Sequence, residues 1–373
     1  MTSLDPGTLG SVTYSTDAPV ILIDDEAKGE LGRDLRRLDV EENTMGLRTL
    51  VARFHADSPE SDGSADELSY LDGDVIDLGR KISVVIGPPG DSRTIFTGTV
   101  SAIEAGFDEG DAPTVSVCAE DALMRLRFRQ RTATWTDMSD ADIVAAIAAD
   151  HGLGSQTDID GPTYPLVQQA EESDLAFLRN RALRLNAEIW IDADDVIHIA
   201  EREQRDGVEL VLTQGNDLIA ATARVDLAHQ RSEITFRGWD DNRVEAIAES
   251  VDGEVIAAEV DGGRTGPDVV AEVFENAVLS RARRDVLSTE RGLSYAEAEM
   301  RRRARSFVTV EGTTNGSPDL VPGARLDLRR VGEPFNGPGY RVTWAHHGYD
   351  LSSGYRTNFR AERPSLGGPA GGS

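Results

Sequence analysis

Short apolar stretches that end in turn-forming residues dominate the first third of the chain. Residues 20–23 form an apolar run that is followed by Asp24 and Asp25, a strand closed by a turn signal. The apolar run at 82–86 is followed by Gly-Pro-Pro-Gly at 87–90, which only a turn accommodates. Further strands are predicted at 47–55, 95–103 and 114–118. Short strands at this spacing, with turn-rich connections, indicate a barrel or a sandwich.

A helical period replaces this pattern in the middle of the chain. Ser139 and Asp142 form a predicted capping box that opens a helix ending near Asp150, with Ile143 and Ile147 on one face. Ser173 is predicted to cap a second helix, because the apolar positions that follow it fit a 3.6-residue period. Residues 188–192 and 196–200 predict a hairpin. The sequence therefore predicts a small α/β insert at 120–204.

Strand patterns return after this insert, with one more helix among them. Strands are predicted at 210–212, 219–225, 232–236, 325–328, 340–346 and 355–362. Ser294 and Glu297 form a predicted capping box for a helix that runs to about Val308. The ends, 1–17 and 366–373, are rich in small and polar residues, which predicts a flexible arm and a disordered tail.

The charge balance narrows the range of partners. The 373 residues carry 66 Asp and Glu but only 38 Lys and Arg, which gives a net charge of −28. Such a surface repels nucleic-acid phosphate and anionic lipid, so we expect no direct nucleic-acid binding. No stretch has the ~20 apolar residues that cross a bilayer, and residues 1–10 lack the features of a signal peptide. We therefore expect that the protein does not insert into a membrane and that it assembles in the cytoplasm. A halophilic source and a GC-rich genome both remain open as origins of the acidity.

Recognisable catalytic and metal-binding patterns are missing from the sequence. It has no Walker loop, no Gly-x-Gly-x-x-Gly, no His-Glu-x-x-His and no Gly-x-Ser-x-Gly motif. Cys118 is the only cysteine and is predicted to be a small core residue on a strand. His346 and His347 are adjacent on a predicted strand, so their imidazoles should diverge. We predict no catalytic, cofactor-binding or metal-binding residues, and a protein that is not an enzyme.

Arginines gather near the last predicted helix, at positions 281, 283, 284, 301, 302, 303 and 305. Glutamates at 290, 297 and 299 are interleaved with them, so i,i+4 pairs on a solvated helix are the favoured interpretation. The functional alternative is an arginine-rich face that docks an acidic neighbour.

Several segments follow one another in a recognisable order along residues 20–363. The most specific one is Gln169-x-x-Glu172-Ser173-Asp174-x-x-Phe177-Leu178. Another is the pair of strands at 78–86 and 95–103, which contains Phe96-x-Gly98; there, Gly98 allows a kink or a close backbone approach. The remaining segments are 115–126, 138–152, 318–323, 339–346 and 354–359. Taken in this order, the segments resemble the tail-hub family, which includes the phage late control protein D and the hub portion of type VI secretion spike proteins.

The resemblance implies a mainly β fold with α/β inserts, built on two related β-barrels. We expect a first barrel at 18–119, the insert at 120–204, and a second barrel at 205–365 with a helical insertion near 268–308. The family implies a homotrimeric hub that adapts a sixfold inner tube to a threefold spike and contacts baseplate wedge components. Fused-spike relatives continue well beyond this length, so a separate spike protein is expected.

Two other function classes remain as alternatives to a hub in a virion tail or injection particle. A tail-associated cell-wall hydrolase would need a carboxylate dyad or a zinc site in a cleft. A wall-binding module would use the 120–204 insert to recognise a polymer. The sequence does not distinguish a phage from an extracellular or membrane-anchored injection system, nor does it identify a cargo or a target cell.

Overall fold

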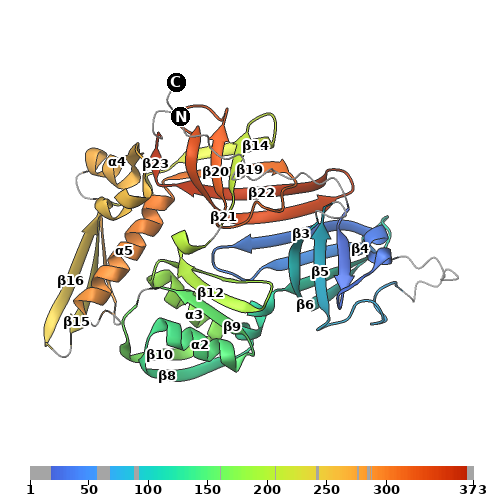
Figure 1. Cartoon of the computed structure of the whole chain (residues 1–373), viewed down its shortest axis with the longest axis horizontal. Coiled ribbons are helices and arrows are strands. Elements are labelled where there is room, and N and C mark those ends of the chain that lie inside the picture. Colours follow the sequence, from blue (N-terminus) through green and yellow to red (C-terminus); the bar gives the residue numbers. More distant parts are fainter. Residues whose placement is uncertain are drawn as a thin grey trace, which may run out of the picture.

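Strand is the main element of the structure, as the sequence pattern predicts (Figure 1). The computed structural model describes residues 18–56, 68–87, 92–159, 161–205, 207–240, 243–274, 277–283, 286 and 288–367. The predicted arm at 1–17 and residues 368–373 of the predicted tail lie outside these described residues. Within the described residues, no helix is both long and apolar enough to cross a membrane.

Most strands join one continuous and mainly antiparallel sheet, which has thirteen strands within the described residues. Its path is β14-β19-β22-β21-β3-β4-β7-β6-β5-β1-β2, with β20 beside β21 and β13 beside β20. The N-terminal elements are β1 (Val20–Ile23), β2 (Glu26–Ala27), α1 (Gly29–Asp34), β3 (Leu35–Asn43), β4 (Thr49–His55), β5 (Lys81–Ile86), β6 (Arg93–Gly106) and β7 (Thr114–Glu120). The later strands are β13 (Glu209–Thr213), β14 (Leu218–Val225), β19 (Val308–Asn315), β20 (Arg325–Arg329), β21 (Gly337–Asp350) and β22 (Gly354–Arg363).

Apart from the short edge strand β2, this sheet consists of two six-stranded halves with the same strand order. The first half contains β1, β3, β4, β5, β6 and β7, and the second contains β13, β14, β19, β20, β21 and β22. If the strands of each half are lettered a to f in chain order, both halves are arranged a-d-e-f-c-b. They differ in the a–d pair, which is antiparallel in the first half and parallel in the second. Strand b of the first half, β3, pairs with strand e of the second half, β21, and so joins them.

Irregularities in the ladders fall at the same strand pairs in both halves. The register shifts between strands d and e, between e and f, and between b and c in each half. The e–f shift lies between Val100 and Ala102 in the first half and between Val342 and Trp344 in the second. One extra residue turns every later side chain of a strand to the other face. Three matching shifts therefore mean that equivalent strands of the two halves can be aligned residue by residue. The fold is thus mainly β, with two related β-barrels.

Each half has its own hydrophobic core. Leu38, Phe54 and Phe96 are fully buried in the first, and Val310, Tyr340 and Phe359 are buried in the second. The close approach predicted at Gly98 is confirmed, since a Cβ atom there would collide with the Glu120 carbonyl oxygen and the Phe96 ring. Alternating inward and outward positions along the strands therefore account for both cores.

An α/β insert follows β7 and has a third core. It contains η1 (Ala122–Arg127), β8 (Gln130–Met138), α2 (Asp140–Asp150), β9 (Gly154–Asp158), β10 (Tyr164–Ser173), α3 (Asp174–Arg184), β11 (Ala187–Ile191), β12 (Val196–Glu201) and η2 (Arg202–Gln204). The predicted capping box at Ser139 and the predicted cap at Ser173 are both confirmed by their hydrogen bonds. The predicted β11–β12 hairpin is also confirmed, with β9 added in parallel to β12.

A second insertion separates β14 from β19 and builds its own small sheet. It contains β15 (Glu233–Asp240), β16 (Glu245–Asp252), η3 (Gly253–Glu259), β17 (Arg264–Thr265), α4 (Gly266–Val273), β18 (Val278–Ala282) and α5 (Thr289–Arg305). The order β16-β15-β18 forms a three-stranded sheet against which α5 packs (Figure 1). Phe236 and Met300 lie in the core that the sheet and the helix share. The strand predicted at 232–236 therefore lies outside the main sheet.

Further details differ from the sequence prediction. The last helix begins at Thr289 with Ser288 as its N-cap, so the predicted cap at Ser294 is wrong and Ser294 lies inside the helix. Leu366, which was expected in the disordered tail, pairs with Arg264 in the short sheet of β17 and β23 (Ser365–Leu366). Strand β3 was not predicted, because only Leu38 and Val40 carry its apolar alternation before a charged residue, Glu42, occupies the next buried position.

Candidate functional site

The side chains of four histidines contact four different partners. His346 and His347 have different neighbours, as predicted for adjacent residues on a strand: His346 Nε2 lies 2.8 Å from Asp39 Oδ1, and His347 Nδ1 lies 2.8 Å from the Tyr355 hydroxyl. His151 contacts Asp174, and His198 contacts Asp192. Within the part of the chain that the structure describes, no group of three or more His, Cys, Asp or Glu residues could hold a metal ion.

Cys118 lies on β7 as predicted, but it is only half-buried. Burial raises the pKa of its thiol, and the nearby Glu104 and Glu120 act in the same direction. A raised pKa keeps the thiol protonated and weakens it as a nucleophile.

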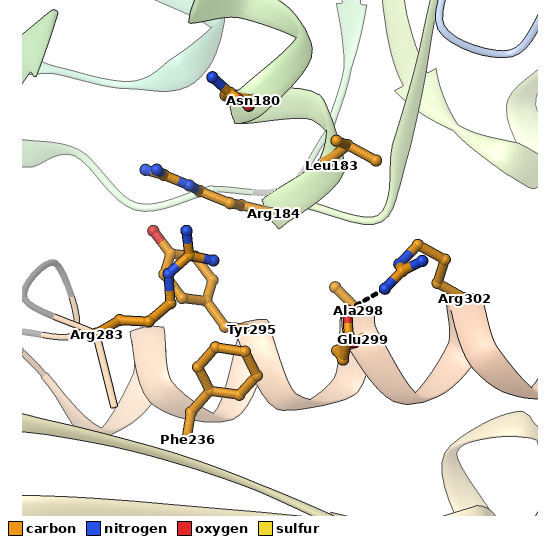
Figure 2. Close-up of a pocket in the computed structure, with 9 residues that line it drawn as sticks. All are labelled: Asn180, Leu183, Arg184, Phe236, Arg283, Tyr295, Ala298, Glu299 and Arg302. Atoms are coloured by element: carbon orange, nitrogen blue, oxygen red, sulfur yellow. Dashed lines mark hydrogen bonds and ion pairs between the residues drawn. The ribbon is translucent and has the colours of Figure 1, made fainter. Parts of the chain in front are cut away.

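A pocket of about 230 Å³ lies between the α/β insert and the second insertion (Figure 2). Helix α3 supplies one wall and α5 the other, with Phe236 of β15 below. The guanidinium carbons of Arg184 and Arg283 each lie 5.9 Å from the centre of the Tyr295 ring, and Arg302 pairs with Glu299 at 2.5 Å. These groups can hold an anionic side chain, but the lining offers no nucleophile beside a base.

The predicted arginine cluster near α5 combines paired and anchoring residues. Glu299 accepts from Arg303 at 2.7 Å, the i,i+4 pairing that the sequence indicates. Arg305 is instead buried and reaches out of the helix to Glu259 at 2.7 Å and to Asn186 of the insert at 2.7 Å. The cluster therefore connects α5 to Glu259 and to the α/β insert, and part of it faces solvent. Arg284 lies outside the described residues.

A buried arginine–carboxylate network lies where the two sheet halves meet the insert. Arg205 donates to Glu42 of β3 at 2.6 Å and to Glu188 of β11 at 3.3 Å, and it lies 4.8 Å from the Trp190 ring. Arg48 donates to the other oxygen of Glu42 at 2.8 Å. Burial alone would raise the pKa of Glu42, but Arg48 and Arg205 hold this pKa below its usual value. The network therefore keeps Glu42 charged inside the protein.

The same network extends into the second half of the sheet. Arg341 of β21 is buried, which lowers its pKa to about 10, and it lies 3.9 Å from Glu188. Its guanidinium also donates to the backbone carbonyl of Arg202. Arg202 in turn pairs with Glu362 of β22 at 2.5 Å. Because these residues come from β3, β11, β21 and β22, the network fixes the insert against both halves.

Sequence reasoning missed this network. Its members are scattered from Glu42 to Glu362, and their spacing matches no motif. The one local signal is Arg341, a charged residue between Tyr340 and Val342 in a predicted strand whose neighbours are apolar. A charge at such a position usually requires a buried partner.

Comparisons with known proteins give one family and several related folds. No curated protein matches the chain in sequence. A family model described as the Alg8 N-terminal domain matches residues 60–349.

Solved structures of tail proteins share the fold over almost the whole chain. The prophage MuSo2 43 kDa tail protein from Shewanella oneidensis has 14% identity and a TM-score of 0.71, covering 93% of this chain and 98% of that one. A tail protein from Neisseria meningitidis has 12% identity and a TM-score of 0.67, covering 93% and 96%. The E. coli c3393 protein, described as a type VI secretion component similar to T4 tail proteins gp27 and gp5, has 14% identity and a TM-score of 0.53, covering 90% and 76%. At these identities the likeness concerns the fold.

Proposed function

The chain belongs to the family described as the Alg8 N-terminal domain, and because it also has the fold of phage tail proteins, we propose that it is a structural part of a phage tail or a tail-like injection particle. Its specific role is that of the hub, a homotrimer between a sixfold inner tube and a threefold spike. The hub assembles in the cytoplasm and binds the spike, and its insertions face the baseplate wedge components.

The observation that carries this proposal is the internal repetition of the sheet. Both halves have the strand order a-d-e-f-c-b and the same register shifts, so one chain presents two similar units. Three chains with two units each present 3 × 2 = 6 similar units around one axis. Such an assembly matches a sixfold ring on one side while it keeps threefold symmetry on the other.

The buried network at Glu42, Arg205 and Arg341 suits this role. An adaptor must hold its two halves in a fixed orientation under load, and charged groups buried at a junction favour one geometry over others. The proposed units are 18–119, 120–204 and 205–365, in agreement with the separate cores at Leu38, Ile189 and Val310.

Affinity purification of the tagged chain from its native host tests the proposal. Mass spectrometry of the eluate should find tube, spike and baseplate proteins, and negative-stain microscopy should show rod-shaped particles. The same tag on an unrelated host protein is the control. A chain recovered without tube or spike partners under inducing conditions would refute the hub role. Zymography on cell walls adds a second test, since clearing by the purified chain would indicate a hydrolase.

A further inference from the structure

Among the strand edges of the main sheet that have no partner strand within the described residues are those of β14 and of the end of β6. Strand β14 pairs with β19 along one edge, while its other edge has only a single bridge, from Leu218 to Gln214. Strand β6 pairs with β5 only as far as Thr99, so residues 101–106 are bordered by β7 on one side alone. Most side chains along β14, including Ala220 and Thr222, are exposed. Open strand edges can accept a strand from another chain.

The edges that correspond to these two in the other half of the sheet are paired with each other within the chain. Strand β6 is strand e of the first half, and the corresponding strand e of the second half, β21, pairs with β3 through residues 344–350. Strand β14 is strand b of the second half, and β3 is the corresponding strand b of the first. The chain therefore makes one b–e contact internally, and the strands that would make the second b–e contact are open.

We propose that β14 of one copy pairs antiparallel with residues 102–108 of the next copy, and so repeats the β3–β21 contact between molecules. This deepens the proposed function, since it rests on the hub being an assembly of several copies and names the surfaces that join them. The partner is a second copy of this chain, because the proposed contact repeats the β3–β21 pairing that the two halves of one chain already form.

The shared register shifts fix the register of this pairing. Val100 and Val342 both precede the e–f shift, so Glu104 corresponds to His346. Leu35 and Leu218 both precede the b–c shift, so Arg224 corresponds to Glu41. Because His346 lies opposite Glu41 within the chain, Glu104 of one copy lies opposite Arg224 of the next.

The side chains that this register brings together are complementary. Glu104 is exposed, and the Arg224 side chain is 71% exposed and pairs locally with Asp226, so both can reach a partner. Opposite charges directly across two strands stabilise a sheet, whereas like charges destabilise it. Next to this pair, Ala105 lies opposite Ala223. Phe107, which is 69% exposed, lies opposite Ala221, so pairing covers an exposed aromatic ring.

The two edges are different surfaces, so the contact is head-to-tail. Head-to-tail contacts close into a ring when the rotation per copy divides a full turn. In a ring of three copies, three internal and three intermolecular b–e contacts alternate, which makes 3 + 3 = 6 similar junctions.

Disulfide trapping in the purified full chain tests the register. Ala105→Cys and Ala223→Cys are combined with Cys118→Ser, and directly opposite Cβ atoms lie about 5 Å apart in such a pair. Oxidation should give covalent oligomers on a non-reducing gel, up to a trimer. In the matched control, Ala105→Cys is combined with Thr222→Cys, whose side chain lies on the other face and should not cross-link. Equal cross-linking of both pairs, or none in either, would overturn the proposal.

Charge reversal gives an independent test. Glu104→Arg or Arg224→Glu alone should raise the apparent dissociation constant of the oligomer about tenfold in sedimentation experiments, and the double variant should recover most of this loss. Glu245→Arg in the separate sheet is the matched control and should change nothing. A chain that stays monomeric at its highest soluble concentration would refute the pairing. Tube and spike proteins recovered without the cross-link would refute only the pairing, and a cross-linked ring that captures neither would refute only the hub.

Discussion

Gly79 and Gly323 occupy equivalent positions in the two halves and make the same hydrogen bond. The Gly79 N–H donates to the Val100 carbonyl at 2.9 Å, and the Gly323 N–H donates to the Val342 carbonyl at 2.9 Å. Both glycines have positive φ angles, 83° and 98°. Each lies two residues before its strand d, so the two halves repeat one backbone conformation where that strand begins.

Gly79→Ala should lower the free energy of unfolding by about 1–2 kcal/mol, because a side chain at positive φ is strained. At Gly79 a Cβ atom would meet nothing within 4 Å, so the strain acts alone. Gly323→Ala should cost more, since its Cβ would also lie 3.2 Å from the Arg205 side chain. Urea denaturation measures both. Gly29→Ala, in open space on a helix, is the control, and an equal loss there would contradict the role of φ.

Arg205→Met should destabilise the protein by roughly 3 kcal/mol or more, because it leaves Glu42 and Glu188 buried with fewer cations. Arg329→Met is the matched control. Arg329 pairs with Asp327 at 2.9 Å, but its side chain is 60% exposed, so the loss should stay below about 1 kcal/mol. Chemical denaturation of the two variants gives the comparison. Equal losses would mean that the junction network contributes no more than a surface pair.

Stability should fall in acid partly because of His347. Burial lowers the pKa of His347 to about 3, well below its usual 6.5, so the native state binds fewer protons than the unfolded state between these values. The His347 contribution is therefore complete above pH 6.5 and is lost as the pH falls toward 3. Asp121 acts in the opposite direction below pH 6, since burial raises its pKa to about 6.

His347→Gln isolates the histidine contribution. Glutamine can still hydrogen-bond with Tyr355 but does not titrate, so the difference in unfolding free energy between wild type and variant should shrink as the pH falls from 7 to 4. His229→Gln, at an exposed position, is the control. A difference that stays constant over this range would show that His347 does not drive the acid loss.

The elements that sequence could predict are those with a local signal. Ser139 and Ser173 each predict the start of a helix from residues within four positions of them, and both caps are present. The fold class followed from strand spacing together with the family resemblance. Strand β3 was missed because the buried face that begins with Leu38 and Val40 continues with a charged residue, Glu42, which shortens the apolar alternation.

The junction network lay beyond prediction for a different reason. Arg205 and Glu42 are 163 residues apart, and their contact exists only because β3, β11 and β21 meet. Neither residue has a neighbouring pattern that distinguishes it among 66 acidic and 38 basic residues. The repetition of the two halves was hidden likewise, since equivalent positions such as Glu104 and His346 share a register but not a residue type.

The N-terminus of α5 provides the sharpest test of a corrected prediction. Ser288 Oγ accepts a hydrogen bond from the Arg291 N–H at 3.3 Å, so Ser288→Ala should cost about 1 kcal/mol of stability. Ser294 is exposed inside the helix, where alanine has the higher helix propensity, so Ser294→Ala should be neutral or slightly stabilising. Thermal unfolding of the two variants distinguishes a helix that is capped by Ser288 from one that is capped by Ser294. A loss at Ser294 with none at Ser288 would place the beginning of the helix where the sequence alone had suggested it.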